Sequence, residues 1–183
     1  MILTELLESI NPKPVIKAAL NFDTRYTYSR TKSALLNEKV KMCLQIIYEK
    51  VKIGDYHYGL STIPDPHDWP RKHNMILRCY EKGEEFRIIT KVYKHCFKPN
   101  LGHLTIIIHD HCDKRRSLKY ACNKFDAMIV ISLRPKGCFE IFTFTSNTVL
   151  NHNFSVNDTA GRLKVTLSVD NRYCHKVAEG QLI

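Results

Sequence analysis

The stretch MILRCYEKGEEFRIITKVY, residues 75–93, decides the fold, because here the spacing of apolar residues changes from that of a helix to that of strands. Two strand-like runs, rich in Ile, Val, Phe and Tyr, flank the turn EKGE at residues 81–84. A short turn that contains glycine between two such runs is typical of a β-hairpin. The segment therefore predicts two antiparallel strands.

Further strands are predicted after this hairpin. HLTIIIH (103–109) is an apolar strand, and FDAMIVISL (125–133), RPKG (134–137) and CFEIFTFT (138–145) form a second hairpin. DKRRSLKYACNK (113–124) is predicted as a short basic helix, and RLKVTLSV (162–169) as the last strand. The second half of the chain is therefore expected to be rich in sheet.

The region before residue 75 is predicted to be helical and then irregular. Apolar residues at helical spacing predict a first helix around residues 3–10 and a long one over 31–51, whose stripe is Leu36, Val40, Cys43, Ile47 and Val51. Glycine and proline punctuate residues 54–74, which are predicted as a long loop. We expect a single domain over 1–183, with a helical part (1–53), this loop (54–74) and a sheet-rich core (75–183). The predicted class is α+β, a mixed sheet flanked by helices.

Charge points to a polyanionic partner. The 183 residues include 28 Lys and Arg against 18 Asp and Glu, a formal net charge of +10. Such an excess favours binding to phosphate backbones, and DNA is the expected partner, with RNA not distinguished from it. The residues expected to contact nucleic acid are the basic ones near the first hairpin and on the basic helix: Arg71, Lys72, Lys94, Lys114, Arg115, Arg116 and Lys119.

The cysteines and the apolar runs bear on the compartment. The seven cysteines are scattered without a C-x-x-C pair, which favours reduced thiols. The first residues carry two acids and no basic segment of the secretory type, and no apolar run approaches the ~20 residues that span a bilayer. We therefore expect an intracellular protein, cytoplasmic or nuclear, without a membrane partner.

Residues 80–144 carry a pattern of strands with a lysine on the second hairpin strand, IITK, and then KFDAMIVISLRPKGCFEIF. The pattern resembles the core of restriction-endonuclease-like, PD-(D/E)XK nucleases, and with the preceding helix the resemblance covers roughly residues 35–149. It implies a restriction-endonuclease-like fold, Mg²⁺ as cofactor and, as in many members, a homodimer. In such enzymes two carboxylates hold the metal against the phosphate, and the lysine orients the attacking water.

The resemblance supports two alignments of the catalytic positions. Alignment on IITK makes Lys91 the family lysine, but it puts Ile89 and Asn74 where carboxylates are expected. A shifted alignment recovers the acids Asp65 and Glu85 but puts arginine at the lysine position. The resemblance thus implies Lys91, Glu85 and Asp65 as catalytic residues. The metal ligands that it implies are Asp65, Asp68, Glu84, Glu85 and, as a neutral ligand, Asn74.

Two other sites and one rival function are weighed beside this one. HDHC at residues 109–112 offers zinc ligands, but no second ligand pair accompanies it, so the spacing disfavours zinc. Tyr56, Tyr58 and Trp69 either stack on unpaired bases or anchor the long loop in the core, and anchoring is favoured for Trp69. We expect a nucleic-acid-binding protein of restriction-endonuclease-like fold, which is either a divergent metal-dependent DNA endonuclease or a relative that has lost cleavage. The rival is a non-enzymatic interaction protein, such as a viral or mobile-element factor, that binds an acidic protein or nucleic acid without cleavage.

Overall fold

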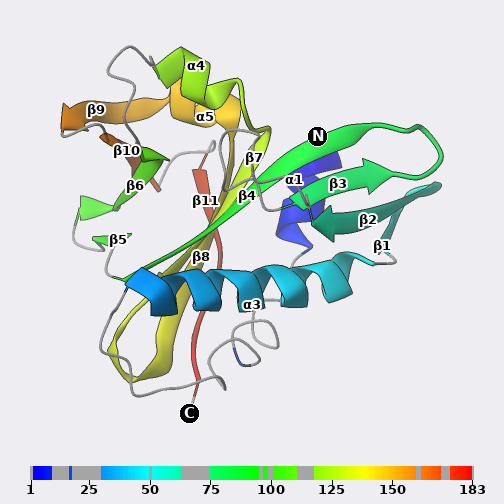
Figure 1. The fold of residues 1–183 in the computed structure, drawn as a ribbon, viewed down its shortest axis with the longest axis horizontal. Helices are drawn as coiled ribbons and strands as arrows, with labels where there is room; N and C mark the ends of the chain where they lie inside the picture. Colours follow the sequence, from blue (N-terminus) through cyan, green and yellow to red (C-terminus); the bar gives the residue numbers. More distant parts are fainter. Residues whose placement is uncertain are drawn as a thin grey trace.

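Strands predominate over helices in the structure, which corrects the predicted α+β class. The computed structural model describes residues 2–9, 17, 30–49, 51–62, 75–94, 97–98, 101–110, 118–159, 162–169 and 174–182. These residues form a curled seven-stranded mixed sheet, here called sheet A, and a separate four-stranded sheet, sheet B (Figure 1). The expected helical part followed by one sheet with flanking helices is therefore wrong.

Sheet A has the order β1-β2-β3-β4-β7-β8-β11. Its strands are β1 (Val51–Ile53), β2 (Tyr56–Thr62), β3 (Met75–Cys79), β4 (Glu85–Lys94), β7 (Ala127–Leu133), β8 (Cys138–Thr145) and β11 (Cys174–Gln181). Both predicted hairpins, β3–β4 and β7–β8, are confirmed as antiparallel pairs. The two hairpins join through the pairing of β4 with β7, which is parallel.

One face of sheet A is covered by the first two helices. These are α1 (Ile2–Glu8) and α3 (Arg30–Tyr48), which overlap the helices predicted from apolar spacing. The predicted end of the long helix at residue 51 is wrong, because Val51 begins strand β1. The buried side of α3 consists of Leu36, Val40, Leu44 and Tyr48, at exact four-residue steps, with Cys43 and Ile47 partly buried beside them. Tyr48 donates its hydroxyl to the carbonyl of Leu6, which ties the two helices together. Burial raises the pKa of this hydroxyl.

The other face of the central strands meets sheet B, whose order is β5-β6-β10-β9. Its strands are β5 (Phe97–Lys98), β6 (His103–Asp110), β9 (Asn153–Thr159) and β10 (Arg162–Ser168). The short helices α4 (Leu118–Cys122) and α5 (Ser146–Asn151) pack against this layer. The 3-10 turn η2 (Pro135–Gly137) connects β7 to β8. Strand β7 lies between the two apolar layers and is buried along almost its whole length, which explains its continuous apolar run.

The two sheets are also joined by a polar contact at an edge. Short β5 pairs only with the first residues of β6, so no described strand pairs with the later part of that edge. The side chain of Tyr93, on β4, bonds the backbone there instead. The Tyr93 hydroxyl donates to the Ile107 carbonyl at 3.2 Å and accepts from the Ile107 amide at 3.3 Å. One phenol thus satisfies both backbone groups of an edge residue.

Several predicted boundaries are corrected. The long loop predicted over 54–74 contains strand β2, and the predicted last strand, β10, is followed by β11. Strand β9 was not expected. Of the basic helix predicted over 113–124, α4 accounts for the part that begins at Leu118, and residues 111–117 lie outside the described ranges. In the described part of the chain, no helix combines the length and the apolar character needed to cross a membrane.

Candidate functional site

Of the predicted acids, Glu84 and Glu85 lie within the described residues, and neither lies near the predicted lysine. Glu85, at the start of β4, is exposed, and it accepts hydrogen bonds from the guanidinium of Arg78 at 2.5 and 2.8 Å. Glu84 is exposed in the preceding turn. Asp65, Asp68 and Asn74 lie outside the described residues.

Lys91 lies far from these acids on the same strand. Lys91 lies six positions after Glu85 along β4, which at about 3.3 Å per residue places their Cα atoms about 20 Å apart. Lys91 is buried, with 8% of its surface exposed, on the face of sheet A that meets sheet B. The structure thus does not bring Lys91 and Glu85 together. Their joint catalytic role, with Asp65 and Mg²⁺, stays a prediction that rests on the resemblance alone.

Lys91 belongs instead to a set of buried polar side chains at the end of the parallel strands. Ser132 of β7 pairs with Glu140 of β8 on the same face, and they are 0% and 6% exposed. Glu140 Oε1 accepts from Arg134 Nη1 at 3.1 Å. Among the described residues, Glu140 Oε2 and Ser132 Oγ find no hydrogen-bond partner.

This buried set offers little to a metal ion. It contributes a single carboxylate, and one oxygen of that carboxylate already faces a guanidinium. Mg²⁺ is usually bound through one or two carboxylates together with phosphate oxygens and water, and here the single carboxylate is shared with Arg134. Across the described part of the chain, no three His, Cys, Asp or Glu side chains are placed to share an ion. The described residues of this buried set therefore do not supply the ligands of a metal-dependent active site.

Most of the predicted basic contact residues cannot be placed. Arg71, Lys72, Lys114, Arg115 and Arg116 lie outside the described residues, as does the side chain of Lys94. Lys119 is exposed on α4. Near it, the ammonium of Lys124 lies 5.0 Å from the ring centroid of Tyr120, a cation–π contact.

A different surface combines basic and aromatic side chains: the face of sheet B that points away from sheet A, here called the outer face of sheet B. On β10, Leu163, Val165 and Leu167 are buried, so the alternate residues Lys164, Thr166 and Ser168 point outward. Strand pairing extends this face across the other strands. Its described side chains are Lys98, His103, Thr105, Ile107, Phe154, Ser155, Asn157, Lys164, Thr166 and Ser168.

Phe154 is the unusual member of the outer face of sheet B. Its ring is 67% exposed and lies against the His103 imidazole, with the ring centroids 4.7 Å apart and the planes at 38°. In a regular strand, Phe154 would lie on the same face as Val156, two residues later, and would therefore point inward. The pairing of β9 with β10, however, shifts at this point: Ser155 faces Thr166 and Asn153 faces Leu167, which leaves Phe154 as the extra residue of a β-bulge.

The bulge that carries Phe154 is anchored on helix α5. The side-chain amide of Asn153 donates to the carbonyls of Val149 and Leu150 at 2.9 and 3.2 Å, which satisfies two backbone acceptors at the end of the helix. The other end of α5 is capped by Thr145, whose hydroxyl accepts from the amide of Thr148. The strand backbone next to Phe154 is therefore fixed to α5 by these hydrogen bonds.

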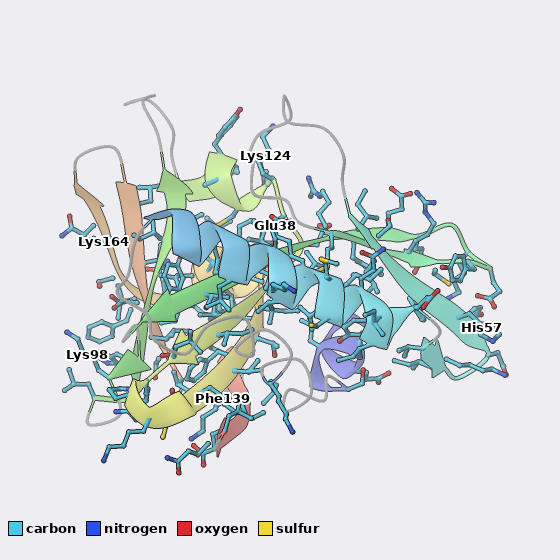
Figure 2. All side chains as sticks on the ribbon, turned by 60° about the horizontal axis from the view of Figure 1, so that its bottom comes forward. Glu38, His57, Lys98, Lys124, Phe139 and Lys164 are labelled. Atoms are coloured by element: carbon cyan, nitrogen blue, oxygen red, sulfur yellow. The ribbon has the colours of Figure 1, made fainter. Side chains whose placement is uncertain are left out.

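Two lysines lie on either side of this aromatic pair. Figure 2 shows Lys98 of β5 and Lys164 of β10 on the same side of the molecule, far from His57. Strand register puts their Cα atoms roughly 16 Å apart, two strands across and four residues along. None of the described side chains on the outer face of sheet B is acidic. The face thus presents positive charge, hydroxyl and amide groups, and an exposed aromatic ring.

The aromatic residues singled out in the sequence have other roles. Tyr58 is buried in the core under α3. Tyr56 is partly buried, and the ammonium of Lys82 lies 4.1 Å from its ring centroid. Trp69 lies outside the described residues. Phe154 was missed because NFSVNDT contains only two apolar residues, and because the bulge depends on the partner strand.

No protein family, curated protein or solved structure matches this chain. The resemblance to restriction-endonuclease-like nucleases is therefore neither supported nor refuted by a relative, and function has to be inferred from the residues themselves.

Proposed function

We propose that this protein binds nucleic acid through the outer face of sheet B. The observation that carries the proposal is the exposed Phe154–His103 ring pair between Lys98 and Lys164, on a sheet face without described acidic side chains. Lysine ammonium groups contact phosphates, and exposed rings offer a surface to bases. Binding modules that use a sheet face in this way are a recurrent solution for nucleic acids.

The remaining side chains of this face suit the same partner. Thr105 and Thr166 lie side by side with their hydroxyls 3.3 Å apart, and Ser155, Asn157 and Ser168 add short polar groups. Hydroxyl and amide groups commonly bond phosphate oxygens and sugars. Because these side chains are short, they leave the sheet surface open to an extended chain. The net charge of +10 adds long-range attraction for a polyanion.

Salt-dependent binding tests the proposal. Fluorescence anisotropy would follow a labelled oligonucleotide, single-stranded and as a duplex, over a series of salt concentrations. We expect binding that weakens steeply with salt, since each phosphate contact releases a counterion. Replacing both lysines of the face, Lys98→Ala with Lys164→Ala, should reduce the slope of log K against log salt for the single strand by about 1.4, at about 0.7 per contact.

A matched double variant controls for the loss of charge. Lys52→Ala with Lys82→Ala removes the same charge at the far end of sheet A, beside His57, and should leave the slope nearly unchanged. Equal losses in both double variants would mean that the contact is not made by the outer face of sheet B. Absence of binding at low salt would refute the proposal. Equally tight binding of a polyglutamate of matched charge would favour the rival, an acidic protein partner.

A further inference from the structure

We infer that the nucleic acid bound by the outer face of sheet B is single-stranded, and that an unpaired base stacks on Phe154. This inference rests on the proposed function and names its substrate class. In a duplex the base faces are covered by their neighbours, and proteins reach only base edges in the grooves. A phenyl ring carries no hydrogen-bonding group with which to read base edges, whereas its face matches the face of an unpaired base.

The setting of Phe154 favours stacking over simple surface exposure. A bulge leaves one residue of the strand without a regular backbone pairing, and bulges commonly redirect a side chain. Here the redirected side chain is the most exposed phenylalanine among the described residues. His103 lies against the ring, so ring orientation is limited, and Asn153 holds the backbone beside it to α5. A ring that is already ordered loses little conformational freedom on binding.

The flanking lysines suit a strand that crosses the sheet. Lys98 and Lys164 lie on opposite sides of the centre of the face, roughly 16 Å apart by register and strand spacing. A flexible single strand can place phosphates at both ammonium groups while one base turns toward the ring between them. A duplex is stiff and cannot bring a base face to the sheet without unpairing it, which costs a few kcal/mol.

Replacement of Phe154 tests the inference. Phe154→Ala removes the ring without changing the charge. Base stacking of about 1–3 kcal/mol predicts about 5- to 150-fold weaker binding of a single strand. The salt slope should stay unchanged, because no phosphate contact is lost. Phe154→Trp keeps an aromatic ring at this position and should bind the single strand about as tightly as the wild-type protein does. Since the ring is largely exposed, both variants should fold, and thermal unfolding would check this.

A second exposed aromatic residue provides the control. Tyr80 is 61% exposed near the β3–β4 turn, at the opposite end of the molecule, and Tyr80→Ala should leave single-strand affinity unchanged. If the wild-type protein binds single strand and duplex equally well, and Phe154→Ala changes neither affinity, the inference is overturned while the proposed function stands. If the wild-type protein binds neither nucleic acid, the proposed function itself fails.

Discussion

Asp126 is predicted to hold together the place where the two hairpins of sheet A join. It immediately precedes β7, and its Oδ2 accepts from the backbone amide of Arg87 at 2.6 Å, where a strand carbonyl would otherwise serve. The same carboxylate accepts from the Arg87 guanidinium at 3.1 Å through Nε and through Nη2. In return, the Asp126 amide donates to the Arg87 carbonyl at 2.9 Å. The substitution Asp126→Ala therefore removes three hydrogen bonds at the first rung of the parallel pair.

The expected cost follows from the exposure of these groups. A hydrogen bond from a backbone amide to a charged group contributes about 1.5–3 kcal/mol, and a solvated ion pair adds about 0.2–1 kcal/mol. The Arg87 and Asp126 side chains are 41% and 32% exposed, so water replaces part of what is lost. We expect Asp126→Ala to lower the free energy of unfolding by about 2 kcal/mol, which for a chain of this size lowers Tm by about 4–8 °C.

Urea unfolding followed by circular dichroism, together with a thermal scan, would measure this cost. Glu85→Ala is the matched control, because it breaks the Arg78–Glu85 pair, which is also an arginine–carboxylate contact but lies exposed and binds no backbone group. Its expected cost is below about 1 kcal/mol. Asp126→Asn keeps an acceptor for the Arg87 amide and should fall between the two. A cost for Asp126→Ala no larger than that for Glu85→Ala would refute the reasoning.

Three further outcomes are expected. Ser132→Ala should raise the free energy of unfolding by up to about 1 kcal/mol in urea, since the buried hydroxyl has no described partner; a loss would mean that an internal water satisfies it. The hydrogen bonds from His57 lower the pKa of Glu81 from 4.5 to about 2, so this contact stabilises the fold above pH 4.5 and its contribution is lost as pH falls toward 2. In an NMR titration, His57→Ala should shift the pKa of Glu81 back toward 4.5, and an unchanged pKa would contradict this. Burial raises the pKa of Cys122 and of Cys174 to about 12, so neither thiol should react with a thiol reagent at neutral pH until urea unfolds the protein. Mass spectrometry would detect the label, and rapid labelling of either thiol in the folded protein would contradict their burial.

The elements with strong local patterns were predicted from the sequence. The hairpin over 75–93 has two apolar runs and a glycine turn, and strands β3 and β4 fall almost exactly on it. The long helix was predicted from its apolar stripe, although the buried residues include Leu44 and Tyr48, which the predicted stripe omitted. In these segments burial on one face dictates the period, so the period is visible in the sequence.

The strands that were missed carry weak patterns. β2 lies in a segment punctuated by glycine, and β9 and β11 are edge strands with many polar residues. An edge strand needs fewer apolar side chains, because one of its sides faces solvent. The count of strands, and with it the class of the fold, therefore escaped a prediction made from apolar spacing.

The candidate site shows the same division between composition and geometry. The charge of the chain indicated a polyanionic partner, and that expectation carries through to the proposal. The predicted contact residues came from runs of lysine and arginine in the sequence, and the predicted catalytic residues came from the resemblance. Of the latter, Lys91 and Glu85 lie far apart because both belong to one extended strand. The outer face of sheet B draws its lysines from β5 and β10, which are more than sixty residues apart in the chain.

The amino-acid sequence alone was enough to locate the strongly patterned helix and hairpins to within a few residues, because each such element buries one face and repeats its apolar residues at its own period. Only the tertiary structure decided that β4 runs parallel to β7, that a second sheet covers the central strands, and that a bulge against β10 turns Phe154 outward. The physical reason is that strand pairing joins segments distant in the chain, and a shift of one residue in register moves a side chain to the other face.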